Sequence, residues 1–407
     1  MKLQGIRVID LSSFLPGPYL TLAMADHGAE VIKVEAPGGD HGRSIGSLDG
    51  DSTVFFRNVN RGKKSIVLDL KQDSDREMLL KLCETADVFV ESFRPGVVTR
   101  LGVDYERVKA RNPRIVYCSI SAFGQNGPYL RRPAHDLAVE AMSGVLSITL
   151  GNDGAPAIPG VPIADVVSGL QGLSAVLMAL LRRMQTGLGD YIDLSMHDSM
   201  ISACVNVLGP AIAEGRQQIA KHERTTGGAA FYRIYRTADD RYLTLAGQEE
   251  KFIRNLLNAL GRSDFIDLCL RGPGPHQAPV IAYFDGLFRG KPLAYWTEWL
   301  FDLDVCFGPV QTFPEALADP QLLARGMVVT DGNGRKHIST PIHFANEPAR
   351  INLHTPNLGQ DTEAITGIQK ALGNQVHRDG ATRESENGCD NEKRRRAPVA
   401  GKLRPLL

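Results

Sequence analysis

The first half of the chain alternates short apolar runs, rich in β-branched residues, with longer stretches whose apolar residues recur at helical spacing. Strands that alternate with helices pair in parallel, so this pattern predicts an α/β large domain built on a parallel sheet. In one intervening stretch, Ser74 and Glu77 are spaced as a capping box ahead of the apolar stripe Met78, Leu79, Leu82 and Cys83, which predicts a helix. Six runs have the length and composition of strands: 6–11, 30–35, 65–70, 87–92, 114–121 and 191–196.

The pattern changes near residue 225. The stretch "FYRIYRTADDRYLTLAG" places two alternating strands around an Ala-Asp-Asp turn and predicts a hairpin. The tandem glycines Gly227 and Gly228 before it fit a mobile or closely approached loop, or a plain linker. We therefore expect four segments: the N-terminal part of the large domain (1–205), a smaller α+β domain (225–325), a segment that returns to the large domain (326–373) and a disordered tail (374–407).

The composition is that of a soluble globular chain large enough for two domains. Of 407 residues, 43% are hydrophobic, and 46 basic side chains balance 46 acidic ones. Zero net charge argues against a nucleic-acid partner. Six cysteines without CxxC or CxH spacing argue against a zinc site and a disulfide scaffold, so we expect no metal.

Membrane insertion and secretion are not expected either. The start "MKLQGIRVIDLSS" leads directly into a strand pattern without a secretory signal. The most apolar stretch, 166–181, is interrupted by Ser168, Gly169, Gln171 and Gly172 and is shorter than the roughly 20 residues of a membrane helix. We expect a cytoplasmic protein without a membrane partner.

Basic side chains recur near the predicted strands, and they bear on the ligand. The first strand is followed by "SSFLPGPYL", without a GxGxxG or GxxxxGK[ST] motif, which disfavours a dinucleotide enzyme or a P-loop ATPase. Each basic residue alone is most simply solvated surface charge, but several at strand ends would suit a polyanionic, nucleotide-like ligand. These residues are Arg61, Lys63, Lys64, Lys71, Arg94 and Arg100.

Three carboxylates and a histidine are the candidates for chemistry. Asp165, in "VPIADVVSGL", is either an N-cap carboxylate or a desolvated carboxylate that acts as nucleophile or base. His135 and Asp136 begin a predicted helix, where the structural interpretation is the simpler one for an isolated pair. Glu249 is by default an exposed charge that opens the next helix.

The ordered motifs together resemble the class III CoA-transferases of the CaiB/BaiF type, which include formyl-CoA transferase, carnitine CoA-transferase and α-methylacyl-CoA racemase. The similarity extends from residue 1 to about 368 and includes "GIRVIDLSSFLPGP", "ADVFVESFRPGV", "PAHDLAVEAMSG" and "PIADVVSGL". It implies a Rossmann-like large domain, a smaller domain and an interlocked homodimer. It also implies coenzyme A as part of the substrate, no tightly bound cofactor, and CoA contacts at Phe14, Leu15, Pro16, Lys71, Phe93, Arg94 and Arg100.

The resemblance implies two enzymatic functions. Asp165 matches the nucleophile of the transferases, which attacks an acyl-CoA thioester and passes CoA to a second carboxylic acid through an acyl anhydride and an aspartyl-CoA thioester. This acyl-CoA:carboxylate CoA transfer is the leading hypothesis, and the form of "PIADVVSGL" favours it. The alternative is epimerisation of a 2-methylacyl-CoA by His135 and Asp165, with Glu249 as the associated residue. A non-catalytic acyl-CoA binding protein is the third and least supported class, and Asp136 receives no role.

Overall fold

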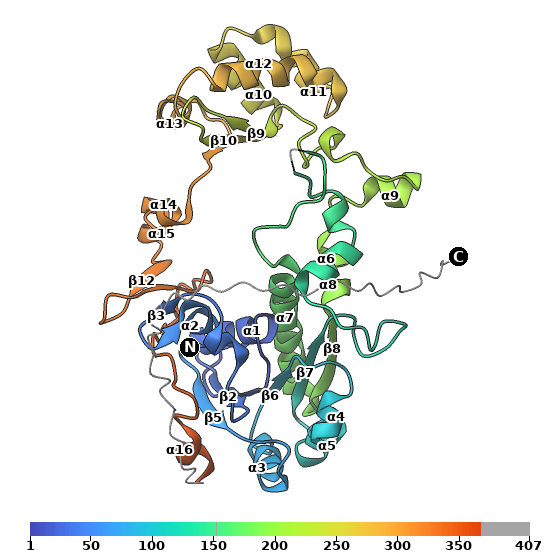
Figure 1. The fold of residues 1–407 in the computed structure, drawn as a ribbon, viewed down its shortest axis with the longest axis vertical. Helices are drawn as coiled ribbons and strands as arrows, with labels where there is room; N and C mark the ends of the chain where they lie inside the picture. The colour runs from blue at the N-terminus through green and yellow to red at the C-terminus, as the bar shows by residue number, and fades with distance from the viewer. Residues whose placement is uncertain (152, 368–407) are drawn as a thin grey trace, which may run out of the picture. The chain divides into compact units, whose positions relative to one another are not determined.

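A six-stranded parallel sheet is the centre of the N-terminal region (Figure 1). The structure is a computed structural model that describes residues 1–151 and 153–367. All six predicted strands lie in this sheet, which confirms the prediction of a parallel α/β sheet. In sheet order the strands are β5 (Lys64–Val67), β2 (Glu30–Glu35), β1 (Arg7–Asp10), β6 (Val88–Glu91), β7 (Val116–Ser121) and β8 (Asp190–Ser195).

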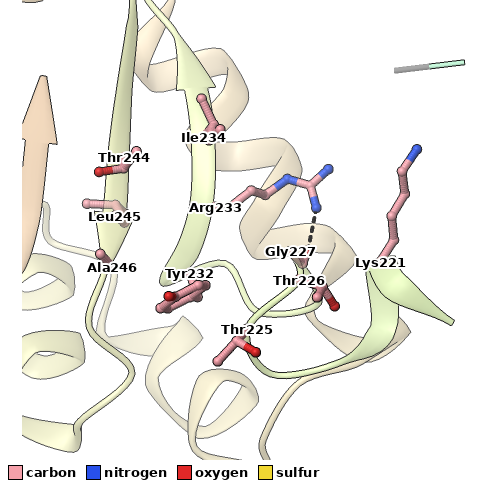
Figure 2. A pocket seen from close by; sticks show the side chains of 10 residues that line it. All are labelled: Lys221, Thr225, Thr226, Gly227, Tyr232, Arg233, Ile234, Thr244, Leu245 and Ala246. Atoms are coloured by element: carbon pink, nitrogen blue, oxygen red, sulfur yellow. Dashed lines mark hydrogen bonds between the residues drawn. The ribbon is translucent and has the colours of Figure 1, made fainter. Parts of the chain in front are cut away.

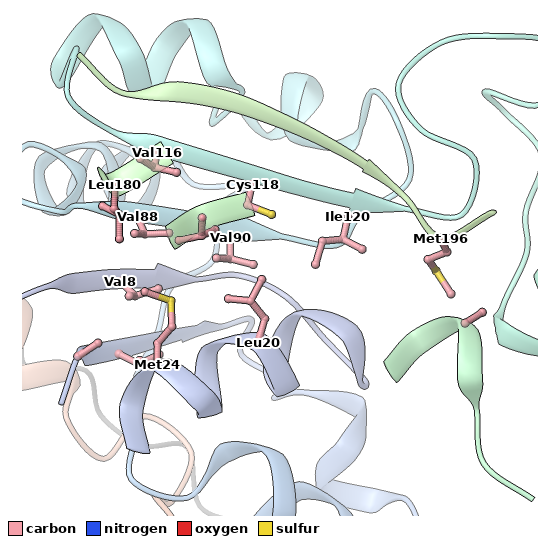
Figure 3. Close-up of a cluster of buried hydrophobic side chains, with 14 of the residues drawn as sticks. Val8, Leu20, Met24, Val88, Val90, Val116, Cys118, Ile120, Leu180 and Met196 are labelled. Atoms are coloured by element: carbon pink, nitrogen blue, oxygen red, sulfur yellow. The ribbon is translucent and has the colours of Figure 1, made fainter. Parts of the chain in front are cut away.

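Helices cover both faces of the sheet because successive side chains of a strand point to opposite sides. Val8 contributes to a core with α1 (Pro16–Asp26) and α7 (Ile163–Thr186), whereas its neighbour Ile9 contributes to a core with α3 (Asp73–Cys83) and α5 (Tyr105–Arg111). Figure 3 shows the first core, with Leu20 and Met24 of α1 beneath the strand residues Val8, Val88, Val90, Val116, Cys118 and Ile120.

The helix predicted after Ser74 is present, but its capping box is not. Gln72 is the N-cap of α3, its backbone is extended, and it makes no side-chain capping hydrogen bond. Ser74 is therefore already inside the helix and cannot cap it. The first turn instead carries Asp73 and Asp75, whose negative charges favour the positive end of the helix dipole. The predicted stripe is retained in part, with Leu79 and Cys83 fully buried.

Helix α7 is longer than the apolar stretch predicted from the sequence. It has 24 residues, and by length and composition alone it is the one described helix that could cross a membrane. The glycines that were expected to interrupt it are instead where it approaches α1. A Cβ at Gly169 would lie 2.7 Å from the carbonyl oxygen of Pro16, and one at Gly172 would lie 2.8 Å from the Leu20 side chain. α7 therefore packs closely on α1 at these two glycines, and a single apolar helix of this kind is weak evidence for a membrane span.

Residues 230–307 have a core of their own. The predicted hairpin is confirmed as β9 (Tyr232–Arg236) and β10 (Tyr242–Ala246), and β11 (Phe307–Pro309) extends it to three antiparallel strands. Phe284, Phe288 and Trp296 lie at the centre of the core. The domain boundaries at 225 and 325 stay a prediction. The helices here are α10 (Glu250–Ala259), α11 (Ile266–Leu270), α12 (Ala278–Phe288) and α13 (Leu293–Phe301).

The segment after residue 326 begins with a short hairpin, β12 (Val328–Thr330) and β13 (Lys336–Ile338). It then runs along the edge strand of the parallel sheet: the N–H of Ser65 donates to Asp361 Oδ2 at 2.8 Å, and the N–H of Val67 donates to Thr362 Oγ1 at 3.0 Å. The predicted tail, 374–407, lies outside the described residues.

The remaining α-helices and strands complete the described part of the chain. They are α2 (Val54–Asn60), α4 (Val97–Leu101), α6 (Asp136–Met142), α8 (Met196–Ala203), α9 (Gly209–Glu214), α14 (Phe313–Ala316), α15 (Pro320–Ala324), α16 (Thr362–Thr366), β3 (Leu48–Asp49) and β4 (Ser52–Thr53).

Candidate active site

A cavity of about 330 Å³ opens at the carboxyl ends of β1, β6 and β7. Ser13 and Phe14 line it from the segment after β1, Phe93 and Arg94 from the segment after β6, and Phe123 from the segment after β7. Strands β1 and β6 are neighbours in the sheet although β2 and β5 lie between them in the sequence. The cavity therefore lies at the point where the strand order reverses, which is where open parallel sheets bind ligands.

Asp165 lines this cavity from the first turn of α7. The N-cap of the helix is Pro162, so the interpretation of Asp165 as an N-cap residue is wrong. One turn further along, Gly169 allows α7 to approach Pro16 closely, as described above. This approach brings the start of α7 to the loop between β1 and α1, so that Asp165, Phe14 and Pro16 share one cavity.

Two further carboxyls, both from α6, meet the start of α7. The N–H of Asp165 donates to Asp136 Oδ1 at 3.2 Å, and the N–H of Ile163 donates to Glu140 Oε1 at 3.0 Å. Burial is the main cause that raises the pKa of Asp165 to about 7, and the neighbouring acidic side chains of Asp136 and Glu140 add to the rise.

The rise in the Asp165 pKa is large compared with the effect of the helix dipole. A negative charge in the first turn of a helix gains about 1 kcal/mol. A pKa of about 7 in place of 3.8 corresponds to about 4 kcal/mol against ionisation. Desolvation and repulsion therefore dominate at this position, and near neutral pH Asp165 is present both as a carboxylate and as a carboxylic acid.

His135 is the N-cap of α6 and lies at the exposed rim of the same cavity. Its ring meets the Phe14 ring edge-on, with centroids 5.9 Å apart, and Phe14 stacks on His41 at 5.5 Å. Phe14 has a φ of 63°, in the left-handed region that non-glycine residues rarely adopt. Such strained residues are concentrated at functional sites. His135 and Asp165 thus line one cavity, as the racemase hypothesis requires.

The cavity brings together six of the residues predicted from the sequence, namely Phe14, Pro16, Phe93, Arg94, His135 and Asp165. Four others are not among its lining residues: Leu15 is the N-cap of α1, Lys71 is exposed after β5, Arg100 is exposed in the last turn of α4, and Glu249 is the N-cap of α10. The functional roles of all ten residues stay predictions.

Two of the basic residues expected to be surface or ligand-binding charges are buried in ion pairs. Arg61 binds Asp26, and Lys63 Nζ lies 3.0 Å from Asp10 Oδ2, with every one of these side chains at most 5% exposed. Burial alone would raise the pKa of Asp10, but the positive charges of Lys63 and Lys33 outweigh it and hold that pKa at about 2. In the sequence, both basic residues lie in the short segment that connects α2 to β5. They stabilise the fold and are not available to a ligand.

Two residues at the site were not found from the sequence. Arg132 lines the cavity, and its guanidinium lies over the Tyr129 ring at 5.3 Å from the centroid. Glu140 is completely buried behind Asp136 and Asp165. Its position four residues after Asp136 puts both carboxyls on one face of a helix, and this spacing was the available signal.

A second cavity, of about 400 Å³, lies on the β9–β10 hairpin (Figure 2). Arg233 extends across it and donates a hydrogen bond to the carbonyl oxygen of Gly227 at 2.6 Å. Gly228 follows, where a Cβ would lie 2.3 Å from the backbone carbon of His222. The tandem glycines therefore form a closely approached turn. None of the predicted catalytic residues is among the lining residues of this cavity.

Metal ligands are not gathered at either cavity. In residues 1–151 and 153–367, no group of three or more His, Cys, Asp or Glu side chains could hold a metal ion. Four described cysteines, at positions 83, 118, 204 and 269, are buried, and burial raises the pKa of Cys83 to about 12. Such thiols are poor ligands and poor nucleophiles.

Comparison with known proteins identifies the family of this chain. The sequence model described as CoA-transferase family III matches residues 3–362. The chain belongs to this family. As a member of CoA-transferase family III, it shares its fold with the crystal structure of a CaiB/BaiF family protein from Brucella suis, with a TM-score of 0.78 at 31% identity over 90% of this chain and 98% of that one.

Curated members of CoA-transferase family III with similar sequences include both transferases and a racemase. The succinate–glutarate CoA-transferase of Agrobacterium fabrum is 34% identical over 88% of this chain and 93% of its own length. The acetyl-CoA:oxalate CoA-transferase of Acetobacter aceti is 35% identical over 81% and 85%. The human α-methylacyl-CoA racemase is 32% identical over 90% and 92%. The chain is thus an enzyme of a family in which both activities occur.

Proposed function

We propose that the protein transfers CoA from an acyl-CoA thioester to a carboxylic acid through a covalent intermediate on Asp165. The observation that carries the proposal is the position of Asp165: a half-buried carboxyl with a pKa of about 7, in a cavity at the carboxyl ends of the parallel strands. A carboxylate with a raised pKa is a stronger nucleophile than one of ordinary pKa, and at neutral pH about half of it is ionised.

The reaction divides into four balanced steps. A carboxylate oxygen of Asp165 attacks the thioester carbonyl carbon, the C–S bond breaks, and CoA leaves as a thiolate from a mixed anhydride. The thiolate attacks the aspartyl carbonyl carbon of that anhydride and releases the first carboxylic acid as its anion, which leaves an aspartyl-CoA thioester. The acceptor carboxylate attacks this thioester and expels the thiolate again. The thiolate then attacks the acceptor carbonyl of the second anhydride, and the Asp165 carboxylate is regenerated.

The apolar walls of the cavity support such a sequence because an anhydride in contact with water would hydrolyse. Phe14, Pro16 and Phe93 supply apolar surface next to Asp165 and, in our proposal, contact CoA. Arg94 lies at the same opening and suits the anionic part of CoA. Lys71 and Arg100, both exposed after β5 and on α4, are proposed to bind its phosphates from outside the cavity.

The acceptor is proposed to be a small dicarboxylic acid. The two transferases compared above are named for succinate, glutarate and oxalate. Within the described residues, the Arg132 guanidinium forms no ion pair and lies over the Tyr129 ring, so its N–H groups are free to bind a second carboxylate. No positive charge acts on the pKa of Asp165, which fits an arginine at the far end of the cavity.

Racemisation of a 2-methylacyl-CoA is the second candidate function. His135 and Asp165 line one cavity, and a carboxyl with a pKa of about 7 suits proton transfer at the α-carbon. Glu249, the third residue of that set, is not among the lining residues of the cavity. We therefore rank this function second.

We also propose that the protein is an interlocked homodimer. The face of α7 that does not pack on α1 exposes apolar side chains, of which Met184 is 83% exposed. Exposed apolar surface of this kind is typical of an interface. A second copy of the chain would cover it, and light scattering should then give twice the mass of the chain. The other members of this exposed set are Leu170, Leu177, Met178 and Leu181.

One experiment separates the two functions. A 2-methylacyl-CoA is incubated with the protein in deuterated water, with and without a second carboxylic acid, and the products are followed by mass. A new acyl-CoA that depends on the added acid, without deuterium at the α-carbon, is the result expected for the transferase. Deuterium at the α-carbon without acyl exchange would instead establish the racemase and exclude the transferase.

A further inference from the structure

Glu140 is a buried carboxyl that the proposed reaction does not use. It is 0% exposed, and it lies on α6 one helical turn after Asp136. Its Oε1 accepts the N–H of Ile163 at 3.0 Å. Its Oε2 has no hydrogen-bond donor in the described part of the chain, and the group next to it is the Asp136 carboxyl.

A buried carboxyl and a partly buried one in contact cannot both be ionised at low cost. Carboxylates offer acceptors only, so a hydrogen bond between them requires a proton on one of the two. Both carboxyls accept a backbone N–H, so burial is what distinguishes them: Glu140 is 0% exposed, whereas Asp136 is only partly buried. The proton therefore belongs on Glu140.

We infer that Glu140 is a neutral carboxylic acid that donates a hydrogen bond to Asp136 and so positions the first turn of α7. The chain of contacts is continuous. Glu140 Oε2–H donates to the Asp136 carboxylate, whose Oδ1 accepts the N–H of Asp165, while Glu140 Oε1 accepts the N–H of Ile163. Glu140 is not among the lining residues of the cavity, so it acts through Asp136 and is a positioning residue.

The charges that face Glu140 reinforce this protonation state. Burial raises the pKa of Glu140 and the neighbouring Asp136 raises it further, and these two effects outweigh the backbone N–H groups of Ile163 and Ala164, which lower it. Asp165 lies on α7, opposite both of them, and His135 precedes Asp136 on α6. Helix α8, which also packs on α6, contributes His197 near the carbonyl oxygen of Met142 and the exposed Asp198. Among the described charged residues, none that acts on the Glu140 pKa is a cation.

Infrared difference spectroscopy tests the protonation state directly and does not depend on activity. Spectra of the wild type and Glu140→Gln are compared in deuterated water at about pH 8, above the Asp165 pKa of about 7. The expected result is a carboxylic-acid carbonyl band in the wild type that Glu140→Gln lacks, with no such loss in the exposed control Glu106→Gln. Absence of that band from the wild type would overturn the inference.

The pH dependence of turnover then tests the positioning role, which rests on the proposed function of Asp165. An amide at position 140 can still accept the N–H of Ile163 and donate to Asp136, but it cannot ionise. Glu140→Gln should therefore keep turnover at pH 7 within about threefold and lose the alkaline decline that ionisation of Glu140 causes in the wild type. Glu140→Leu, which makes neither bond, should lose roughly 100-fold in turnover, the scale of a misplaced catalytic group.

The variants also distinguish this inference from the proposed function. Equal losses in Glu140→Gln and Glu140→Leu, or an unchanged alkaline decline in Glu140→Gln, would contradict the positioning role. A wild type that transfers no CoA to any acid would contradict the proposed function, whereas the infrared result would still decide the state of Glu140.

Discussion

The N–H of Asp165 donates to the carboxylate of Asp136 at 3.2 Å, so two acidic side chains lie side by side at the start of α7. The hydrogen bond fixes the first turn of the helix, and the negative charge of Asp136 opposes ionisation of Asp165. One contact therefore both positions the proposed nucleophile and tunes its pKa. No role for Asp136 follows from the sequence alone, and this contact gives it one.

The pH dependence of turnover should follow the ionisation of Asp165. The nucleophile is the carboxylate, so kcat/KM should rise with pH through about 7, where Asp165 loses its proton. Asp136→Asn keeps an oxygen that can accept the N–H of Asp165 but removes the neighbouring charge, and it should move the rise about one pH unit lower. Asp198→Asn, at an exposed position on α8, is the matched control and should not move it. An unshifted profile in Asp136→Asn would show that the two carboxyls are not coupled.

Ionisation of Asp165 near neutral pH should lower the free energy of unfolding of the protein. Its pKa is 3.8 in the unfolded chain and about 7 in the folded protein, so the folded state binds the proton more tightly. The stability that this proton provides is complete below pH 4 and is lost as the pH rises to about 7. Asp165→Asn should therefore stabilise the protein by up to about 4 kcal/mol at pH 8 and by much less at pH 4. Denaturant unfolding at both pH values checks this, and a pH-independent difference would contradict the raised pKa.

The sheet could be predicted from the sequence because its cause is local. Each strand is a short β-branched run, and all six runs lie in the parallel sheet. The position of Asp165 in a cavity depends instead on Gly169, four residues later, which lets α7 approach Pro16. That contact joins segments about 150 residues apart in the sequence, and the periodicity of neither segment predicts it.

Two predictions failed where a residue or an element boundary outside the motif decides the structure. Lys63 has the appearance of a surface charge in "NRGKKS", yet it lies in the interior because Asp10 of β1 neutralises its charge. Ser74 and Glu77 have capping-box spacing, yet α3 begins earlier, at Asp73. In both cases a partner or boundary outside the motif decides the structure.

Lys63 and Lys64 are adjacent in the sequence, but the first is buried and the second is exposed, so they offer a matched pair of variants. Lys63→Met leaves Asp10 charged in the interior and should destabilise the protein by about 3–5 kcal/mol. Lys64→Met removes a side chain that is 48% exposed and pairs with Glu30 at the surface, and it should cost less than about 1 kcal/mol. Denaturant midpoints measure both. Equal losses of stability in the two variants would mean that Lys63 does not form an interior ion pair with Asp10.

Phe14 should contribute to substrate binding more than to stability. Phe14→Ala and Phe14→Gly both remove the ring that contacts His135 and His41, and each should raise the KM for acyl-CoA by about tenfold. Glycine tolerates the φ of 63° without strain, so Phe14→Gly should be about 1 kcal/mol more stable than Phe14→Ala. Kinetics and thermal unfolding of the two variants test this. An unchanged KM in both would remove Phe14 from the substrate site.

Covalent catalysis by Asp165 is tested most directly by intact-protein mass spectrometry of the enzyme quenched in acid during turnover with an acyl-CoA. We expect a covalent CoA adduct that fragmentation locates on Asp165, that disappears when an acceptor acid is added, and that is absent from Asp165→Asn. Continued CoA transfer by Asp165→Asn, or an adduct located on a different residue, would contradict covalent catalysis by Asp165.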